Sequence, residues 1–146
     1  MFDFVSKLLR KKEIQKPSIE HDQFGHMEFD QNSKSWETTK YKIYLNIPGN
    51  IDQPFTESVD FINTKIQEID KYWKISEDDL LEIAHNWDSM DKAISVKDLF
   101  KVSSISINSL DSHEWEICFE TQKGNKWIYI GLHFEKDEIV ANDITT

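Results

Sequence analysis

The sequence is poor in the residues that build disulfides and cofactor sites. It contains one cysteine, Cys118, so it has neither a disulfide framework nor a thiolate metal site. We therefore expect Cys118 to be a buried thiol in a reducing compartment. The four glycines are isolated from one another, which leaves no glycine-rich loop for a phosphate group.

Long apolar runs are also missing. No stretch of about 20 apolar residues exists, so the sequence predicts no transmembrane helix. The first residues lack an uninterrupted apolar segment with a small-residue cleavage site, so we expect no secretory signal and a cytoplasmic protein. A length of 146 residues with 38% hydrophobic side chains is typical of one folded domain.

Basic residues are scarce outside the N-terminal segment. The chain has 17 Lys and Arg against 27 Asp and Glu, a formal net charge of −10. Residues 1–16 hold five basic and two acidic side chains, a balance of +3, so the remaining 130 residues carry −13. Contacts with nucleic-acid phosphates need concentrated Lys and Arg, so we expect no nucleic-acid partner. An acidic body favours a basic protein partner.

The charge pattern divides the chain into a basic amphipathic N-terminal helix at residues 1–16 and a single α+β domain at residues 17–146. Apolar residues recur at helical spacing from Phe4 to Leu9, and basic residues follow. Two interpretations stay open. Residues 1–12 could make weak contact with an anionic membrane surface, or the helix could dock on the domain.

The strongest structural signal is a hairpin at Glu114–Phe134. Two runs rich in aromatic and β-branched residues flank a short polar turn. If Gly124 and Asn125 form the turn, Lys123 faces Lys126 and the register of both strands follows. One face then carries Trp115, Ile117, Phe119, Thr121, Ile128, Ile130, Leu132 and Phe134. This face is almost purely apolar, so another layer must cover it.

The first half of the chain predicts two strands and a set of helices. Residues 13–23 are interpreted as a linker, residues 24–30 as a strand, and Trp36 as the start of a second strand whose alternating part is residues 41–47. Thr56 is a plausible N-cap for a helix of about five turns. The apolar stripe of this helix consists of Val59, Ile62, Ile66, Ile69 and Trp73.

Further signals predict two more helices and the final strands. Ser76 resembles a capping-box residue and would begin a second helix, with Leu80, Ile83, Ala84 and Trp87 facing inward. A loop is expected at residues 88–94, and Ser95 would begin a short third helix. Strands are expected at residues 103–108 and 138–144, the last with Ile139 and Ala141 on one side. The fold class is α+β: an antiparallel sheet of about five to six strands with two to three helices on one face, in the order ββ-ααα-ββββ.

The hairpin face opposite the apolar one is the candidate binding surface. Its proposed binding residues are Trp127, Tyr129, Glu116, Glu120 and His133. The aromatic residues are of the types enriched at binding hot spots, and the register places Glu116 directly opposite His133. A Glu/His pair could also serve general acid–base catalysis, or be an ordinary cross-strand ion pair. Alternatively, another helix, either the second or the N-terminal one, could cover Trp127 and Tyr129.

No other constellation indicates catalysis or metal binding. His21 and His26 are five residues apart and match no zinc spacing, and His85 lies outside any HExxH motif. Cys118 would lie between two glutamates, which raise the pKa of a thiol. We therefore predict no catalytic residue, no metal ligand and no cofactor.

The run HDQFGHMEFD…SWE…YKIYLNIPG, with the later KWIYIGLHFE and ANDI, resembles a group of small uncharacterised bacterial proteins. These share a short basic leader, an early FG strand, a Trp-bearing second strand and a late hairpin. Some are proposed immunity proteins of polymorphic toxin systems. The resemblance implies a bacterial cytoplasmic protein that acts by binding. It carries over no functional residue, because the shared motifs are structural.

Three functions from different classes follow. The first is a protein-binding module, such as an immunity-type inhibitor that occludes a basic toxin domain. The second is a small hydrolase or transferase that uses the Glu/His pair. The third is a structural or membrane-peripheral protein that uses the N-terminal helix. The sequence leaves the oligomeric state open.

Overall fold

The computed structural model describes residues 16–87, 95–123 and 126–146. Eight strands and three helices follow one another in this part of the chain. The elements are β1 (Ser18–His21), β2 (Gly25–Asp30), β3 (Ser35–Lys40), β4 (Ile43–Pro48), α2 (Thr56–Gln67), α3 (Ile69–Trp87), α4 (Val96–Leu99), β5 (Phe100–Ser109), β6 (Glu114–Thr121), β7 (Tyr129–Glu135) and β8 (Glu138–Thr145). The expected N-terminal helix at residues 1–16 and the loop at residues 88–94 lie outside the described residues, Lys16 excepted.

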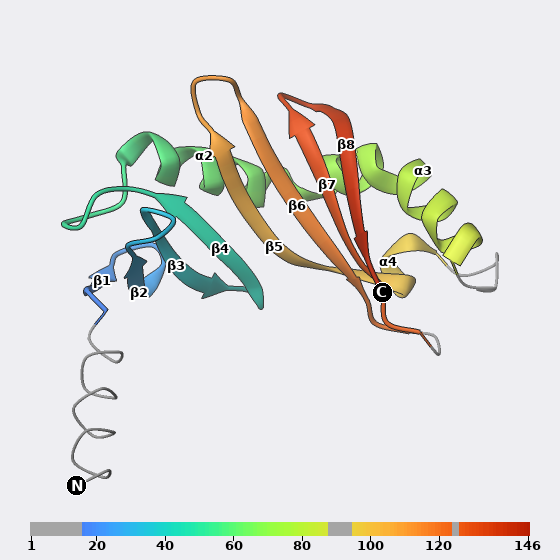
Figure 1. Cartoon of the computed structure of the whole chain (residues 1–146), viewed down its shortest axis with the longest axis horizontal. Coiled ribbons are helices and arrows are strands. Elements are labelled where there is room, and N and C mark those ends of the chain that lie inside the picture. The colour runs from blue at the N-terminus through green and yellow to red at the C-terminus, as the bar shows by residue number, and fades with distance from the viewer. Residues whose placement is uncertain (1–15, 88–94, 124–125) are drawn as a thin grey trace, which may run out of the picture.

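All eight strands form one sheet, in the order in which they occur along the chain. Each strand pairs antiparallel with the next, except that β4 and β5 are parallel. The helices form the connection between these two parallel strands and lie across one side of the sheet (Figure 1). The α+β class is therefore confirmed, whereas the strand number and order differ in detail from the expectation.

The predicted register of the β6–β7 hairpin is confirmed. Glu116 pairs with His133, and Cys118 pairs with Gly131. The turn residues Gly124 and Asn125 lie outside the described residues. The apolar face is buried as expected at Trp115, Ile117, Phe119, Ile128, Ile130, Leu132 and Phe134.

The N-terminal half contains four strands where two were expected. The segment interpreted as a linker includes β1, which pairs with β2. The strand expected from Trp36 to residue 47 is divided into β3 and β4 by a turn at Tyr41 and Lys42, whose φ angles are 53° and 63°. A two-residue hairpin turn with both φ angles positive normally uses Gly or Asn, so Tyr41 and Lys42 carry no turn signal. Tyr41 is consequently exposed rather than part of the inward face.

The boundary between the first two helices was also placed wrongly. The helix that begins at Thr56 ends at Gln67, and α3 begins at Ile69, whereas Ser76 is buried within α3. Thr56 is the first helical residue and Phe55 the N-cap, with no side-chain capping bond. The helix boundaries therefore do not follow the local capping pattern, because most of the stability of a helix in a protein comes from packing of its apolar face. Ser95 does precede α4, and Leu80, Ile83 and Ala84 are buried; the side chain of Trp87 is not described.

The last strand is present, but its faces differ from the prediction. The pairing between β7 and β8 shifts by one residue, because His133 pairs with Ala141 and Phe134 with Ile139. The bulge therefore places Ile139 on the helix side and Ala141 on the opposite side, where one shared face was expected.

The core is a dense layer between the helices and the sheet. Trp115 stacks on Phe134, and Tyr72 from α3 meets both rings edge-on. The Nζ atom of Lys65 lies 4.8 Å from the ring centroids of Phe61 and Trp115 and 4.9 Å from that of Tyr72. Burial lowers the pKa of Lys65, and the negative faces of the three rings compensate part of that desolvation.

The same core residues connect the helices to the β7–β8 turn. The buried hydroxyl of Tyr72 donates a hydrogen bond to Oδ1 of Asp137 at 2.8 Å and accepts one from Nζ of Lys65 at 2.6 Å. Nε1 of Trp115 donates to the backbone oxygen of Lys136 at 2.7 Å. No helix among the described residues is long and apolar enough to cross a membrane.

Candidate binding face

The side of β6–β8 that faces away from the helices is the candidate functional surface, and we call it the open face. Paired residues on neighbouring strands point to the same side, so the register assigns its members directly. The open face consists of Glu114, Glu116, Cys118, Glu120, Tyr129, Gly131, His133, Glu135, Glu138, Ala141, Asp143 and Thr145, together with Trp127 at the entry to β7.

One end of the open face is strongly acidic. Glu114 pairs with Glu135, and Glu135 pairs with Glu138, so three exposed glutamates stand side by side across three strands. The next row contains Glu116 and His133. Like charges directly opposite one another are unfavourable in a sheet, so this end has a strong local preference for a cation.

The other end carries two stacked aromatic rings. The ring centroids of Trp127 and Tyr129 are 5.9 Å apart with an interplanar angle of 28°, and Trp127 is 50% exposed. Nε1 of Trp127 donates to Oε2 of Glu120 at 3.2 Å, and Nζ of Lys101 lies 3.2 Å from Oε1. These contacts, with the Trp127 hydrogen bond the larger, lower the pKa of Glu120. The carboxylate therefore ties the indole ring to β6.

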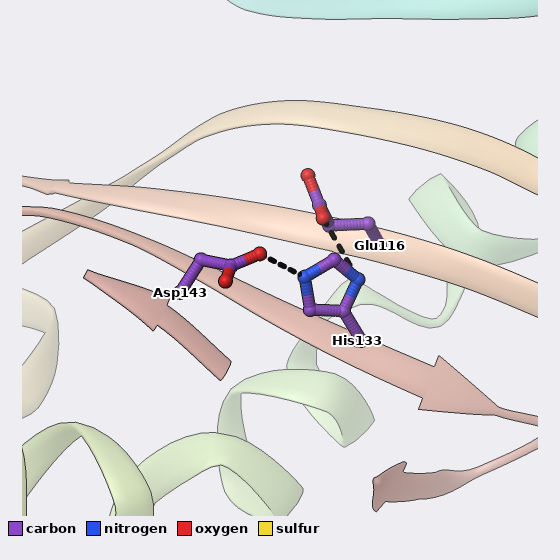
Figure 2. Close-up of side chains that lie close together, drawn as sticks. All are labelled: Glu116, His133 and Asp143. Atoms are coloured by element: carbon purple, nitrogen blue, oxygen red, sulfur yellow. Dashed lines mark hydrogen bonds and ion pairs between the residues drawn. The ribbon is translucent and has the colours of Figure 1, made fainter. Parts of the chain in front are cut away.

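Three side chains from three strands meet in the middle of the open face (Figure 2). Nδ1 of His133 is 3.0 Å from Oε2 of Glu116, and Nε2 is 2.6 Å from Oδ2 of Asp143. Both ring nitrogens can donate at the same time only when the imidazole carries two protons and a positive charge. Glu116 and His133 are mostly buried side chains, at 21% and 26% exposure, whereas Asp143 is 79% exposed.

Cys118 lies beside this cluster as a protonated thiol. Its Sγ donates to Oε1 of Glu116 at 2.9 Å, and burial, followed by that carboxylate, raises the pKa of Cys118 to about 11. Such a thiol is a poor nucleophile at neutral pH. The predicted buried thiol is thus confirmed, and its neighbours suit a structural role.

Gly131 lies next to the cluster in the sheet. It pairs with Cys118 on one side and Asp143 on the other. A Cβ atom at Gly131 would lie 3.4 Å from Cδ of Glu116 and 3.6 Å from Sγ of Cys118. These are ordinary van der Waals distances, so the Glu116 carboxylate and the Cys118 thiol both lie over Gly131.

The structure brings all five predicted binding residues onto this one face. No helix among the described residues covers it, because α2, α3 and α4 lie against the other side (Figure 1). The alternative in which the second helix covers Trp127 and Tyr129 is therefore wrong. Whether the N-terminal helix does so lies outside the described residues.

The sequence did not reveal Asp143 or the row of three glutamates. The alternation of the two strands is a signal that places Glu114 and Glu135 on the same face as Glu116 and His133. The position of Asp143 depends on the bulge between β7 and β8, which no sequence pattern marks, whereas Glu138 pairs with Glu135 across the short turn before the bulge.

Five concave sites in the described residues lie away from the cluster. They occur where α3 meets α4, where β1 meets α2, along α2, beneath the β3–β4 turn, and beside Phe55 and Ile107. None of these five is lined by Glu116, Glu120 or His133. A hydrolase or transferase would need a concave site around its acid–base pair.

Comparison of the chain with protein-family models, with curated proteins and with solved structures found no match.

Proposed function

We propose that this protein acts by binding a basic protein partner on the open face, as an immunity-type inhibitor in the bacterial cytoplasm. The observation that carries the proposal is the stack of Trp127, which is exposed, on Tyr129, on the same sheet face as the glutamate row and left uncovered by the described helices. Inhibition would work by occlusion, in which the bound face covers the functional surface of the partner.

Charge and shape have separate roles in this proposal. The glutamate row at Glu114, Glu135 and Glu138 attracts lysine and arginine side chains, which raises the association rate at low salt. The aromatic pair supplies apolar contact with little loss of side-chain entropy, and such residues account for most of the binding energy in many interfaces. Small molecules are bound mostly in concave pockets, so an open sheet face suits a protein partner better.

The test is capture of a partner from native bacterial lysate at low salt with the full-length chain. Expected support is a basic protein that binds the wild type, dissociates as salt rises, and binds Trp127→Ala at least about 30-fold more weakly, the effect of losing a hot spot of about 2 kcal/mol. Phe55→Ala is a matched control, because Phe55 is also an exposed aromatic residue, at 48%, but precedes α2 away from the open face.

The proposal is contradicted if the captured protein is acidic or if its binding is independent of salt. It is also contradicted if Phe55→Ala weakens binding as much as Trp127→Ala. Recovery of no specific partner at low salt would count equally against it. The expected membrane contact of residues 1–12 is a separate proposal, and liposome co-sedimentation with and without residues 1–16 tests it.

A further inference from the structure

The centre of the open face contains a group of side chains whose types and positions suit a metal ion. Among the described residues, Glu116, His133 and Asp143 are the one set of three whose potential ligand atoms all lie within 4.8 Å of one another. They come from β6, β7 and β8, so the paired backbones of three strands fix their Cα positions (Figure 2). We propose that these three side chains bind a divalent transition-metal ion, with Zn²⁺ as the best fit.

The distances allow coordination with small side-chain movements. Zn²⁺ binds imidazole nitrogen and carboxylate oxygen at about 2.0–2.2 Å, which places tetrahedral ligands about 3.4 Å apart. The longest separation in the present group, at most 4.8 Å, therefore has to close by about 1.4 Å. Asp143 can supply this movement, because its side chain is 79% exposed and lies at the edge of the sheet.

The ligand chemistry selects the kind of ion. One imidazole and two carboxylates form a mixed nitrogen and oxygen set, which suits zinc, whereas Mg²⁺ and Ca²⁺ prefer oxygen ligands alone. In the present arrangement the imidazole stands between the carboxylates and contacts each through a different nitrogen. An ion would take the position between the carboxylates, with one nitrogen of His133 bound to it.

The surroundings support an ion at this position. The Glu116 carboxylate lies over Gly131, with Oε2 3.5 Å from the position that a Cβ atom would take there. The thiol of Cys118 donates to Oε1 of Glu116 and leaves Oε2 for the ion. Such a hydrogen bond to a ligand orients it and tunes its affinity. With three ligands from the protein, water would occupy the fourth position.

His26 provides a matched internal control. It also stands between two carboxylates, with Nδ1 3.0 Å from Glu20 and Nε2 3.4 Å from Glu28. Its side chain is 57% exposed, and the three residues do not meet the distance condition that the Glu116 group meets. A histidine between two acids is therefore not sufficient for the proposed site. The distinguishing feature is the convergence of the three side chains on β6–β8, two of them partly buried.

The test is titration of the metal-free full-length protein with Zn²⁺ in competition with a chelating dye, with Mg²⁺ as a comparison ion. We expect one ion per chain, at least tenfold weaker binding in His133→Gln and in Asp143→Asn, and unchanged binding in His26→Gln. Mg²⁺ in excess should not displace Zn²⁺. Nitrogen NMR of the histidine side chains should show a metal-dependent shift at His133 and none at His26.

Asp143→Asn keeps the test decisive if His133→Gln fails to fold, since Asp143 is an exposed side chain on the edge strand. The proposal is overturned if the wild type shows no saturable binding of Zn²⁺, if Asp143→Asn binds as tightly as the wild type, or if His26→Gln loses as much affinity as His133→Gln. This inference does not rest on the proposed protein-binding function, because the titration contains no partner.

Discussion

The substitution Tyr72→Phe tests the polar cluster that joins α3 to the β7–β8 turn. It removes one oxygen atom from a fully buried side chain and leaves the ring in place against Trp115 and Phe134. The lost atom donates to Asp137 at 2.8 Å and accepts from Lys65 at 2.6 Å. Any change in stability should therefore report these two hydrogen bonds rather than a change in packing.

The expected loss can be estimated from the exposure of each partner. A hydrogen bond to a charged group contributes roughly 1.5–3 kcal/mol, and an unsatisfied buried group costs about as much. The carboxylate of Asp137 is 50% exposed, so water replaces most of what it loses. The Lys65 side chain is only 11% exposed and retains Asp137 at 3.9 Å, beyond hydrogen-bond distance. We expect Tyr72→Phe to lower the free energy of unfolding by about 2 kcal/mol, a fall in Tm of about 4–8 °C.

The loss should depend on pH in a defined direction. Hydrogen bonds from Lys71 and then from Tyr72 hold the pKa of Asp137 below its ordinary value of 3.8. A carboxyl group with a lowered folded-state pKa stabilises the protein above its unfolded-state pKa, and this contribution disappears as the pH falls through the folded-state value. The difference between the wild type and Tyr72→Phe should therefore be largest near neutral pH and should narrow below about pH 3.8.

Urea denaturation at pH 7 and at acid pH measures the loss of stability in Tyr72→Phe and its dependence on pH. Tyr129→Phe is the matched control, because its hydroxyl lies 3.4 Å from Oγ of Ser104 on the open face; we expect a loss below about 1 kcal/mol there. A loss of less than about 0.5 kcal/mol for Tyr72→Phe, or a loss of the same size at both pH values, would refute the reasoning.

Three further substitutions have expected effects on stability that denaturation can measure. Glu135→Gln removes the middle charge from the glutamate row, so it should stabilise the fold by a few tenths of a kcal/mol at low salt, and a destabilisation would contradict the assigned register. Gly49→Ala should destabilise by about 1–3 kcal/mol or more, because the new Cβ would lie 2.6 Å from Cα of Pro54; a neutral result would mean that this loop is free to move. Ser76→Ala should stabilise by roughly 0.5–2 kcal/mol, because Ser76 lies within α3 with a buried hydroxyl that has no hydrogen-bond partner among the described residues, and a loss of stability would reveal such a partner.

The sequence predicted the parts of the fold in which local and long-range signals agree. At the β6–β7 hairpin, strand propensity, alternation and a Gly-Asn pair all indicate the same register, and the pairing of Glu116 with His133 follows. At Ser76 the local signals suggested the start of a helix, but packing of Tyr72 and Leu80 carries the helix through that residue. A buried serine within a helix cannot be distinguished by pattern from a capping serine.

The candidate site was predictable to the same extent. The aromatic residues and the Glu116–His133 pair could be placed because they lie within one hairpin. Asp143 could not, because its position depends on a bulge and on which strand pairs with β7. The turn at Tyr41 and Lys42 shows a similar limit, since positive φ angles at such residues are imposed by the neighbouring strands.

The parallel contact between β4 and β5 divides the sheet into two halves of four strands each. Tyr44 and Ser104 are neighbours in the sheet although 60 positions separate them in the chain, whereas every other pair of adjacent strands belongs to consecutive segments joined by a turn. Each four-stranded half can assemble from contacts that are close in sequence, and the contact between the halves has to form against a much larger loss of chain entropy. The entire open face belongs to the C-terminal half, so transient separation of β4 from β5 would leave the acidic rows and the aromatic pair in place.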